Sequence, residues 1–498
     1  MHTINVLQFG PDNFSKQYEL YGGCVWHYET EVDFEKPFVY DMVILDRAIT
    51  EEEKLYIYKA VRPYRMFYLD DIEQNEDTEW IIKSRMAKPI RRAELDTFLV
   101  EMPRLYFSYA YGEKYDPRDI SIAQGFEGSI KWNGYTGIVL EGNFGHELSQ
   151  VAYWRINLPL DHTAVEFWLE YKKQGDIEIS LEVTLFVSGS ISEIQEQWEF
   201  SEEELENVVW CHNKGNKGSF FVSLKAKGKG TLEIIALHDR HSREGQGNFL
   251  PGGDRYVTSD REEVFFYFDP MDMKPPLNIY FSGYKTMEGY EGTHMFERMD
   301  SPYLLISESR LEGGGFYLGS PEYERLIEEK IRYYMDYLGF TREQVNMSGL
   351  SMGTFGAMYY GSKIMPHAIL LGKPLASLGD IADNERVSRP GGFPTSLDVI
   401  WKNYESIDKE DLVSANDRFW NQFDRADWGK TKFAVAYMIE DDYDGTAYRQ
   451  LLEHLVSDGV TVYGKGLHGR HNDDTPGIVG WFKNQYDSIM RNDFGRKR

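Results

Sequence analysis

The sequence predicts an α/β protein with a small N-terminal α/β part, a central β-sandwich and a larger C-terminal part of alternating strands and helices. Three observations lead to this expectation. The first part has nearly continuous apolar runs, typical of strands buried on both faces. The middle part alternates with a period of two, and the last part alternates apolar strands with helical segments. The chain has 498 residues. We place the domains at residues 1–110, 115–250 and 262–498.

The first domain is expected to be a small, Rossmann-like α/β domain. The stretches INVLQFG (residues 4–10) and FVYDMVILD (38–46) predict buried strands. Thr50 and Glu53 form a capping box that opens a helix after the second strand. No Gly-rich phosphate loop follows the first strand, so the sequence predicts no nucleotide site here.

The middle domain is expected to be an antiparallel sandwich of short strands, of a kind that often binds carbohydrate. Residues 177–185 alternate without a break between apolar and polar side chains, which predicts a strand with one buried face. Gly-rich segments such as KGKG (227–230) are expected to be turns between strands. Four aromatic residues could stack on sugars, or could be core or interdomain residues: Trp132, Tyr135, Trp154 and Trp168.

The C-terminal domain is expected to contain a parallel sheet with helices on both faces. Ser320 and Pro321 predict a helix start, and Gly339 predicts the end of that helix. Thr475 and Pro476 are expected to cap the final helix. The run of three glycines at residues 313–315 follows no clear strand-to-helix turn, so we expect a flexible loop there.

Composition excludes several classes of function. The net charge is −27, which repels phosphate backbones and makes nucleic-acid binding unexpected. The N-terminus lacks a basic segment followed by an apolar one, and no apolar run reaches the length of a membrane helix. Two cysteines in so long a chain do not form a disulfide framework. We therefore expect a soluble, cytoplasmic protein.

The stretch GLSMG (residues 349–353) carries the first sign of catalysis. In an α/β-hydrolase, G-x-S-x-G forms a sharp turn between a strand and a helix, and the serine at its centre is the nucleophile. Side chains at Gly349 or Gly353 would collide with neighbouring backbone. The pattern therefore predicts an α/β-hydrolase-like domain in which Ser351 is the nucleophile.

A base and an acid follow Ser351 in the order that this fold requires. His468 and His471 lie in the loop after the last strand, and we prefer His471 because its surroundings are polar and rich in turn residues. The acid is expected at the end of the preceding strand, at Glu440, Asp441 or Asp442. The stretch IEDD (residues 439–442) resembles a common GEDD loop, which favours Asp442 as the acid. Glu440 is nearer to the strand end, so the choice stays open.

Two backbone N–H groups are expected to stabilise the oxyanion. One would belong to Met352, directly after the nucleophile. The other would belong to Gly283 or Tyr284, in the bend after the strand LNIYFSG (residues 277–283). We expect no metal ion and no cofactor at this site.

The elbow GLSMGTFGAMYYG (349–361), the tail GLHGRHNDDTPGIVGWF (466–482) and the three-part layout resemble one known family over essentially the full chain. This is the second accessory secretory protein of the accessory Sec system, which exports serine-rich-repeat glycoprotein adhesins in streptococci and staphylococci. In this resemblance Ser351 matches the family nucleophile and His471 the base, while the acid is the least secure position.

The resemblance implies an O-acetyltransferase that modifies N-acetylglucosamine on the adhesin and is needed for its export. It also implies assembly with the first and third accessory secretory proteins, and work beside the accessory SecA motor at the membrane export site. The acetyl donor is not identified. Two alternatives are a non-enzymatic export adaptor with a hydrolase-like scaffold and a carbohydrate esterase, because an acyl-serine can pass its acyl group to water or to a sugar.

Overall fold

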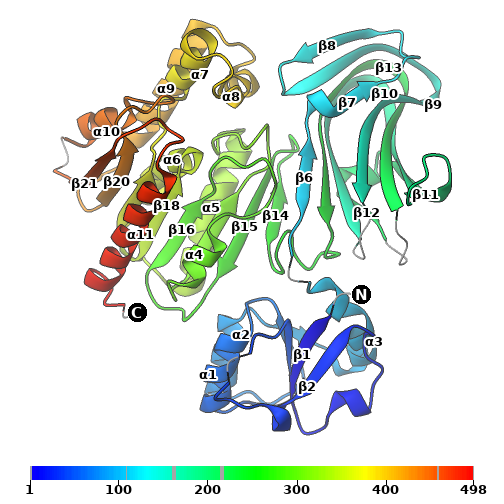
Figure 1. Ribbon diagram of the computed structural model, residues 1–498, viewed down its shortest axis with the longest axis vertical. Helices are drawn as coiled ribbons and strands as arrows, with labels where there is room; N and C mark the ends of the chain where they lie inside the picture. Colours follow the sequence, from blue (N-terminus) through cyan, green and yellow to red (C-terminus); the bar gives the residue numbers. More distant parts are fainter. Residues whose placement is uncertain are drawn as a thin grey trace. The chain divides into compact units, whose positions relative to one another are not determined.

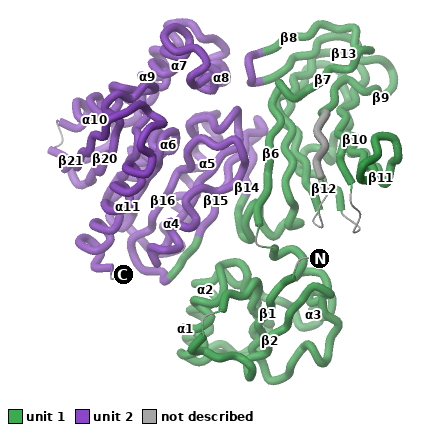
Figure 2. Tube along the Cα trace, viewed as in Figure 1, with its two compact units in different colours: residues 1–132, 137–254, 269–271 green, residues 133–136, 255–268, 272–498 purple. Residues whose placement is uncertain are grey.

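The computed structural model describes residues 3–36, 38–107, 109–159, 164–212, 218–456 and 459–496, without the side chains of residues 155–159 (Figure 1). The chain forms two compact units (Figure 2). The first comprises residues 1–132, 137–254 and 269–271, and the second comprises residues 133–136, 255–268 and 272–498. The division into three domains stays a prediction.

The N-terminal sheet is parallel and has helices on both faces. Its strand order is β2-β1-β3-β4-β5, the order of a doubly wound fold. One face packs under α1 and α2 and the other under α3, each with its own apolar core. The Thr50–Glu53 capping box is confirmed at the start of α1. The elements are β1 (Ile4–Phe9), β2 (Cys24–Tyr28), β3 (Met42–Leu45), α1 (Glu51–Ala60), β4 (Met66–Leu69), α2 (Glu76–Ser84), β5 (Lys88–Ile90) and α3 (Leu95–Glu101).

The middle sheet is antiparallel and is dominated by three long strands. They are β9 (Gly137–Pro159), β10 (Val165–Val187) and β13 (Gly218–His241). The pairing register between them shifts at several positions, and strands typically bend at such irregularities. Their buried side chains belong to one hydrophobic core. The elements are β6 (Gly112–Tyr115), β7 (Ile120–Ile122), β8 (Ser129–Asn133), β9 (Gly137–Pro159), β10 (Val165–Val187), β11 (Ile194–Ser201), β12 (Val209–Cys211) and β13 (Gly218–His241).

The expected turn at KGKG (residues 227–230) is wrong, and three strands of this sheet are long rather than short. Residues 227–230 lie inside β13 and pair with β10. A Cβ on Gly228 would lie 1.9 Å from the Asp176 carbonyl oxygen, so glycine allows close contact between the two strands rather than a turn. Trp154 and Trp168 are buried core residues and offer no stacking face, whereas Trp132 is 51% exposed.

The C-terminal sheet has the strand order β14-β15-β17-β16-β18-β19-β20-β21, with β16 to β21 all parallel to their neighbours. This confirms the expected α/β-hydrolase-like arrangement of alternating strands and helices. The strands are β14 (Asp254–Val257), β15 (Glu263–Asp269), β16 (Leu277–Phe281), β17 (Tyr303–Ser307), β18 (Val345–Leu350), β19 (Ala368–Gly372), β20 (Lys432–Met438) and β21 (Thr461–Leu467). The helices are α4 (Thr293–Glu297), α5 (Pro321–Leu338), α6 (Met352–Ile364), α7 (Leu378–Asp383), α8 (Thr395–Tyr404), α9 (Lys409–Phe423), α10 (Ala447–Leu455) and α11 (Thr475–Asn492).

Helix ends in this part mostly agree with the sequence signals. Ser320 caps α5 and Gly339 ends it in the left-handed conformation, as predicted. The N-cap of α11 is Asp474, so Thr475 is the first helical residue and the predicted cap is wrong by one position. The three glycines at 313–315 form a buried loop instead of a flexible one.

None of the helices within the described ranges combines the length and the apolar character that crossing a bilayer requires.

Candidate active site

The predicted elbow joins β18 to α6 at Ser351. This residue has φ 50° and ψ −123°, a strained conformation for a residue with a side chain. A Cβ on Gly349 would lie 2.2 Å from the Gly353 carbonyl carbon, and a Cβ on Gly353 would lie 2.1 Å from the Phe281 oxygen. Glycine is therefore required at both positions, as the motif predicts. The Ser351 N–H donates to the Gly372 carbonyl at 2.8 Å, which ties the elbow to β19.

His471 is the histidine that the fold brings to Ser351. Its Nε2 lies 2.8 Å from Ser351 Oγ, although the two residues are 120 positions apart. The imidazole is almost fully buried. His468 lies elsewhere: its side chain is 85% exposed and its Nδ1 lies 3.0 Å from Glu440 Oε1.

The three consecutive carboxylates have three different partners. Asp441 Oδ2 lies 2.8 Å from His471 Nδ1, on the side of the ring opposite Ser351. Asp442 Oδ1 accepts from the His471 backbone N–H at 2.9 Å. Glu440 accepts from the Gly469 N–H at 2.6 Å, beside the exposed His468. Of the three candidate acids, Asp441 is therefore the one in contact with the buried imidazole.

The surroundings of Asp441 keep it ionised. Burial alone would raise the pKa of this carboxyl. The His471 ring and the N–H groups of Tyr443 and Asp444 bind the charged form and bring the pKa below its usual value. A carboxylate in this state can hold the imidazole in one orientation and stabilise its protonated form.

Three side chains that the sequence did not single out hold the histidine loop in place. The Tyr443 ring stacks on the His471 ring, with centroids 4.4 Å apart, and Phe393 stacks on Tyr443. Arg389 lies over the Tyr443 ring and makes a 2.9 Å ion pair with Asp442. Tyr443 directly follows the three carboxylates in the sequence, and this position could have identified it as a residue of the site. The sequence near Arg389 offers no such signal.

Asp444 is a further buried carboxyl on the same loop. It accepts from the N–H groups of Ala376 and Ser377, both at 2.9 Å. Burial raises the pKa of Asp444 to about 6, and these two N–H groups oppose the effect only in part. Asp444 joins the acid loop to the segment after β19 and does not contact His471 in the described structure.

The predicted oxyanion donors lie around the same serine. Met352 begins α6, so its N–H is at the N-terminal end of the helix. The Gly283 N–H donates to Glu291 Oε2 at 2.7 Å. In this conformation the Gly283 donor is therefore already engaged, and Tyr284 is the next residue along the same bend.

The arrangement has the contacts that acyl transfer to a serine requires. Ser351, His471 and Asp441 form an unbroken chain of polar contacts, and all three follow the carboxyl ends of parallel strands. Such a chain lets an imidazole take the serine proton while a carboxylate stabilises the resulting charge.

The chain is similar to known proteins over almost its whole length. Residues 4–496 match the family described as the accessory Sec system GspB-transporter. The chain is 36% identical to a protein of the accessory Sec system from Streptococcus gordonii over 510 residues, covering 100% of both chains. It is 35% identical to the corresponding protein of Staphylococcus aureus over 514 residues, covering 99% of this chain and 98% of that one.

A solved structure matches at similar identity. It is a chain of the Glycosylation Associate Protein (Gap123) complex from Streptococcus agalactiae, with a TM-score of 0.91 and 35% sequence identity. The match covers 99% of each chain.

Proposed function

Because the chain belongs to the accessory Sec system GspB-transporter family, we propose that it O-acetylates N-acetylglucosamine on a serine-rich-repeat adhesin and is needed for the export of that adhesin. The resemblance to the second accessory secretory protein is confirmed, and the chain is an accessory Sec system component. The observation that supports the enzymatic part is the contact chain from Ser351 through His471 to Asp441.

The first half of the proposed reaction forms an acyl-enzyme. His471 Nε2 takes the proton of the Ser351 hydroxyl while Oγ attacks the carbonyl carbon of an acetyl donor. The N–H of Met352 and one N–H from the bend after β16 bind the oxyanion. When the intermediate collapses, the bond to the donor's leaving group breaks, and the leaving group takes the proton from His471.

The second half passes the acetyl group to the sugar. A hydroxyl of N-acetylglucosamine attacks the acyl carbon and gives its proton to His471. Collapse releases the acetylated sugar, and the proton returns to Ser351 Oγ. We assign no metal ion or organic cofactor to these steps, and the acetyl donor is not assigned.

We also propose the partners that the family resemblance implies. They are the first and third accessory secretory proteins and the accessory SecA motor, at the cytoplasmic face of the membrane. The similar chain from Streptococcus agalactiae belongs to a complex, which supports assembly with other accessory proteins.

The test compares adhesin glycans from strains that carry the wild-type chain, Ser351→Ala or His468→Ala. Mass spectrometry is expected to find acetylated N-acetylglucosamine with wild type and His468→Ala, and none with Ser351→Ala. The His468 variant is the matched control, because that histidine is on the same loop but is exposed and away from Ser351.

Each alternative predicts a different outcome. Acetylation that persists with Ser351→Ala would exclude the enzymatic proposal and favour an export adaptor. Loss of acetylation with continued export would separate the two functions. Release of acetate from acetylated glycan by the purified chain, without transfer to a sugar, would favour a carbohydrate esterase.

A further inference from the structure

The peptide group between Ser282 and Gly283 is held at both of its polar atoms. Its carbonyl oxygen accepts from the Tyr317 hydroxyl at 2.7 Å. Its N–H donates to Glu291 Oε2, also at 2.7 Å. Because a peptide group is planar, fixing both atoms also fixes its rotation and the position of the Gly283 Cα, from which the chain continues. The residue that follows is Tyr284, one of the two candidates for the second oxyanion donor.

Tyr317 is placed firmly enough to hold this peptide. It is fully buried, and its ring packs edge-on against Phe281 with centroids 5.0 Å apart. Its hydroxyl also lies 3.2 Å from the Ile306 carbonyl oxygen. Burial raises the pKa of Tyr317 well above its usual value, so the hydroxyl stays a neutral donor.

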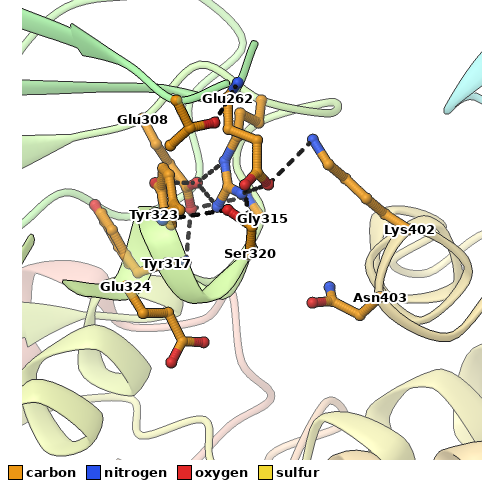
Figure 3. Close-up of polar contacts among 12 residues, drawn as sticks. Glu262, Glu308, Gly315, Tyr317, Ser320, Tyr323, Glu324, Lys402 and Asn403 are labelled. Carbon is orange, nitrogen blue, oxygen red and sulfur yellow. Dashed lines mark hydrogen bonds and ion pairs between the residues drawn. The ribbon is translucent and has the colours of Figure 1, made fainter. Parts of the chain in front are cut away.

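A buried ion cluster holds the backbone of Tyr317 (Figure 3). Glu308 Oε1 accepts from the N–H groups of Gly315 and Tyr317 at 2.8 and 2.7 Å. Glu308 Oε2 accepts from Arg310 Nε at 2.8 Å, and Arg310 Nη1 donates to Glu262 at 2.7 Å. Arg310 is completely buried, so these charge-assisted hydrogen bonds form away from water and are strong.

The loop that this cluster supports also contacts both predicted oxyanion residues. A Cβ on Gly314 would lie 2.4 Å from Met352 Cε, and a Cβ on Gly313 would lie 2.2 Å from the Tyr284 ring. The glycine loop therefore lies against the side chains of Met352 and Tyr284. The same scaffold thus touches both residues and holds the peptide before one of them.

We propose that Glu291 and Tyr317 are positioning residues that clamp the Ser282–Gly283 peptide and so set the Tyr284 N–H, not the Gly283 N–H, as the second oxyanion donor. This inference rests on the proposed function and names a part of its machinery. Neither residue reacts: each acts by orienting a peptide group before the chemical step.

If Glu291 instead blocks the oxyanion site, the expected change in rate has the opposite direction. If the Gly283 N–H were the working donor, the Glu291 carboxylate would occupy the position that an oxyanion needs. Removing the carboxylate would then raise the rate. The direction of the change in rate on removing the Glu291 carboxylate therefore distinguishes a positioning residue from one that blocks the oxyanion site.

The test measures hydrolysis of p-nitrophenyl acetate by the purified full chain, with Ser351→Ala as the baseline. Tyr317→Phe and Glu291→Met should each lower kcat by about 10–100-fold with KM nearly unchanged, because the oxyanion forms only in the transition state. Glu291→Gln keeps an oxygen that can accept from the Gly283 N–H, and should retain kcat within about 3-fold of wild type.

Two controls separate positioning from loss of folding. Tyr486→Phe removes an equally buried hydroxyl, one that donates to Ser348 Oγ, and should leave kcat within about 3-fold of wild type. Labelling with a fluorophosphonate counts the competent Ser351 sites in each sample, so that kcat is expressed per folded site.

The outcomes are distinct. If wild type does not exceed Ser351→Ala, the proposed function fails and the clamp fails with it. If wild type is active but Tyr317→Phe or Glu291→Met matches or exceeds it, only the clamp is overturned. Equal losses in Glu291→Gln and Glu291→Met would also overturn it, since the acceptor oxygen would then not matter.

Discussion

At the scale of single residues, the three adjacent carboxylates of the acid loop show how one turn gives similar side chains different tasks. Asp441 lies against the His471 ring, Asp442 holds the His471 backbone, and Glu440 faces the exposed His468. Of the three, only Asp441 is placed to stabilise a charged His471 ring.

We expect Asp441→Asn to lower kcat for acetyl release by about 10²–10⁴-fold. The pKa of Asp441 is below its usual 3.8, so the carboxylate is charged throughout the neutral range and is lost only in strong acid. Glu440→Gln is the matched control and should change kcat little, because Glu440 is exposed. A larger loss in Glu440→Gln than in Asp441→Asn would contradict this assignment.

The sequence could not choose among these carboxylates. Periodicity tells which side of a helix or strand a side chain occupies, but a loop has no period. The pattern favoured Asp442, and the contact with the ring belongs to its neighbour. The preference for His471 over His468 as the base rested on the polar, turn-rich surroundings of His471. It stays a prediction, which the 2.8 Å contact between His471 Nε2 and Ser351 Oγ supports.

Asp444 should make stability depend on pH. Its pKa is about 6 in the folded chain, against a usual 3.8. Between these values the native chain keeps a proton that the unfolded chain has lost, so the free energy of unfolding falls as pH rises. At about 1.4 kcal/mol for each pKa unit, the total is about 3 kcal/mol.

Asp444→Asn should remove this dependence and stabilise the chain at pH 7 by up to about 3 kcal/mol. The amide oxygen can still accept from the Ala376 and Ser377 N–H groups. Urea unfolding at pH 4.5 and pH 7 measures the effect, with the exposed Asp336→Asn as control. An unchanged difference between the two pH values in Asp444→Asn would refute the prediction.

At the scale of elements, the elbow depends on glycine for steric reasons. Gly353→Ala should destabilise the chain by about 1–3 kcal/mol or more and abolish acyl transfer, because the new Cβ would lie 2.1 Å from the Phe281 oxygen. Gly480→Ala in α11 is the control. Its Cβ would meet nothing within 4 Å, and it should stabilise the helix by about 0.5–1 kcal/mol.

Thermal unfolding followed by circular dichroism measures both variants. A neutral Gly353→Ala would mean that the elbow can shift away from Phe281, and the steric argument would fail.

Local signals predicted individual helices better than they predicted the middle sheet. The capping box at Thr50 and the cap at Ser320 are satisfied within a few residues, so the sequence alone reveals them. The glycines of β13 look like turn residues, yet they pair with β10 over a separation of about fifty residues. Such pairing is decided by tertiary contacts, and short-range propensity does not contain it.

At the scale of the whole chain, the alternation of strands and helices was enough to predict the C-terminal α/β arrangement. The buried cluster of Glu308, Arg310 and Glu262 was not foreseen, since charged residues are normally expected at the surface. The glycine run beside it was expected to be flexible because it follows no clear strand-to-helix turn. Its contacts with Tyr284 and Met352 join segments that are distant in the sequence.

The net charge of −27 should make stability depend on salt. Raising NaCl from about 10 mM to about 150 mM shortens the screening length from about 30 Å to about 8 Å and weakens self-repulsion. We expect Tm to rise by about 1 °C, which for a chain of 498 residues corresponds to about 1 kcal/mol. Calorimetry at fixed pH measures it, and a falling Tm would show that attractive ion pairs outweigh the repulsion.

Ser351 and His471 are 120 positions apart in the sequence, and this separation has a consequence for the order in which the parts of the site are synthesised. Ser351 leaves the ribosome well before His471, and α11 follows His471. Ile478 of α11 packs against Ala436 and Met438 of β20, the strand that leads to Asp441. A nascent chain that ends before His471 therefore holds a serine without its proposed base, and one that ends before α11 holds a strand without its cover. If the proposed function holds, we expect a newly made molecule to gain its chemistry only after residues 471–492 have left the ribosome.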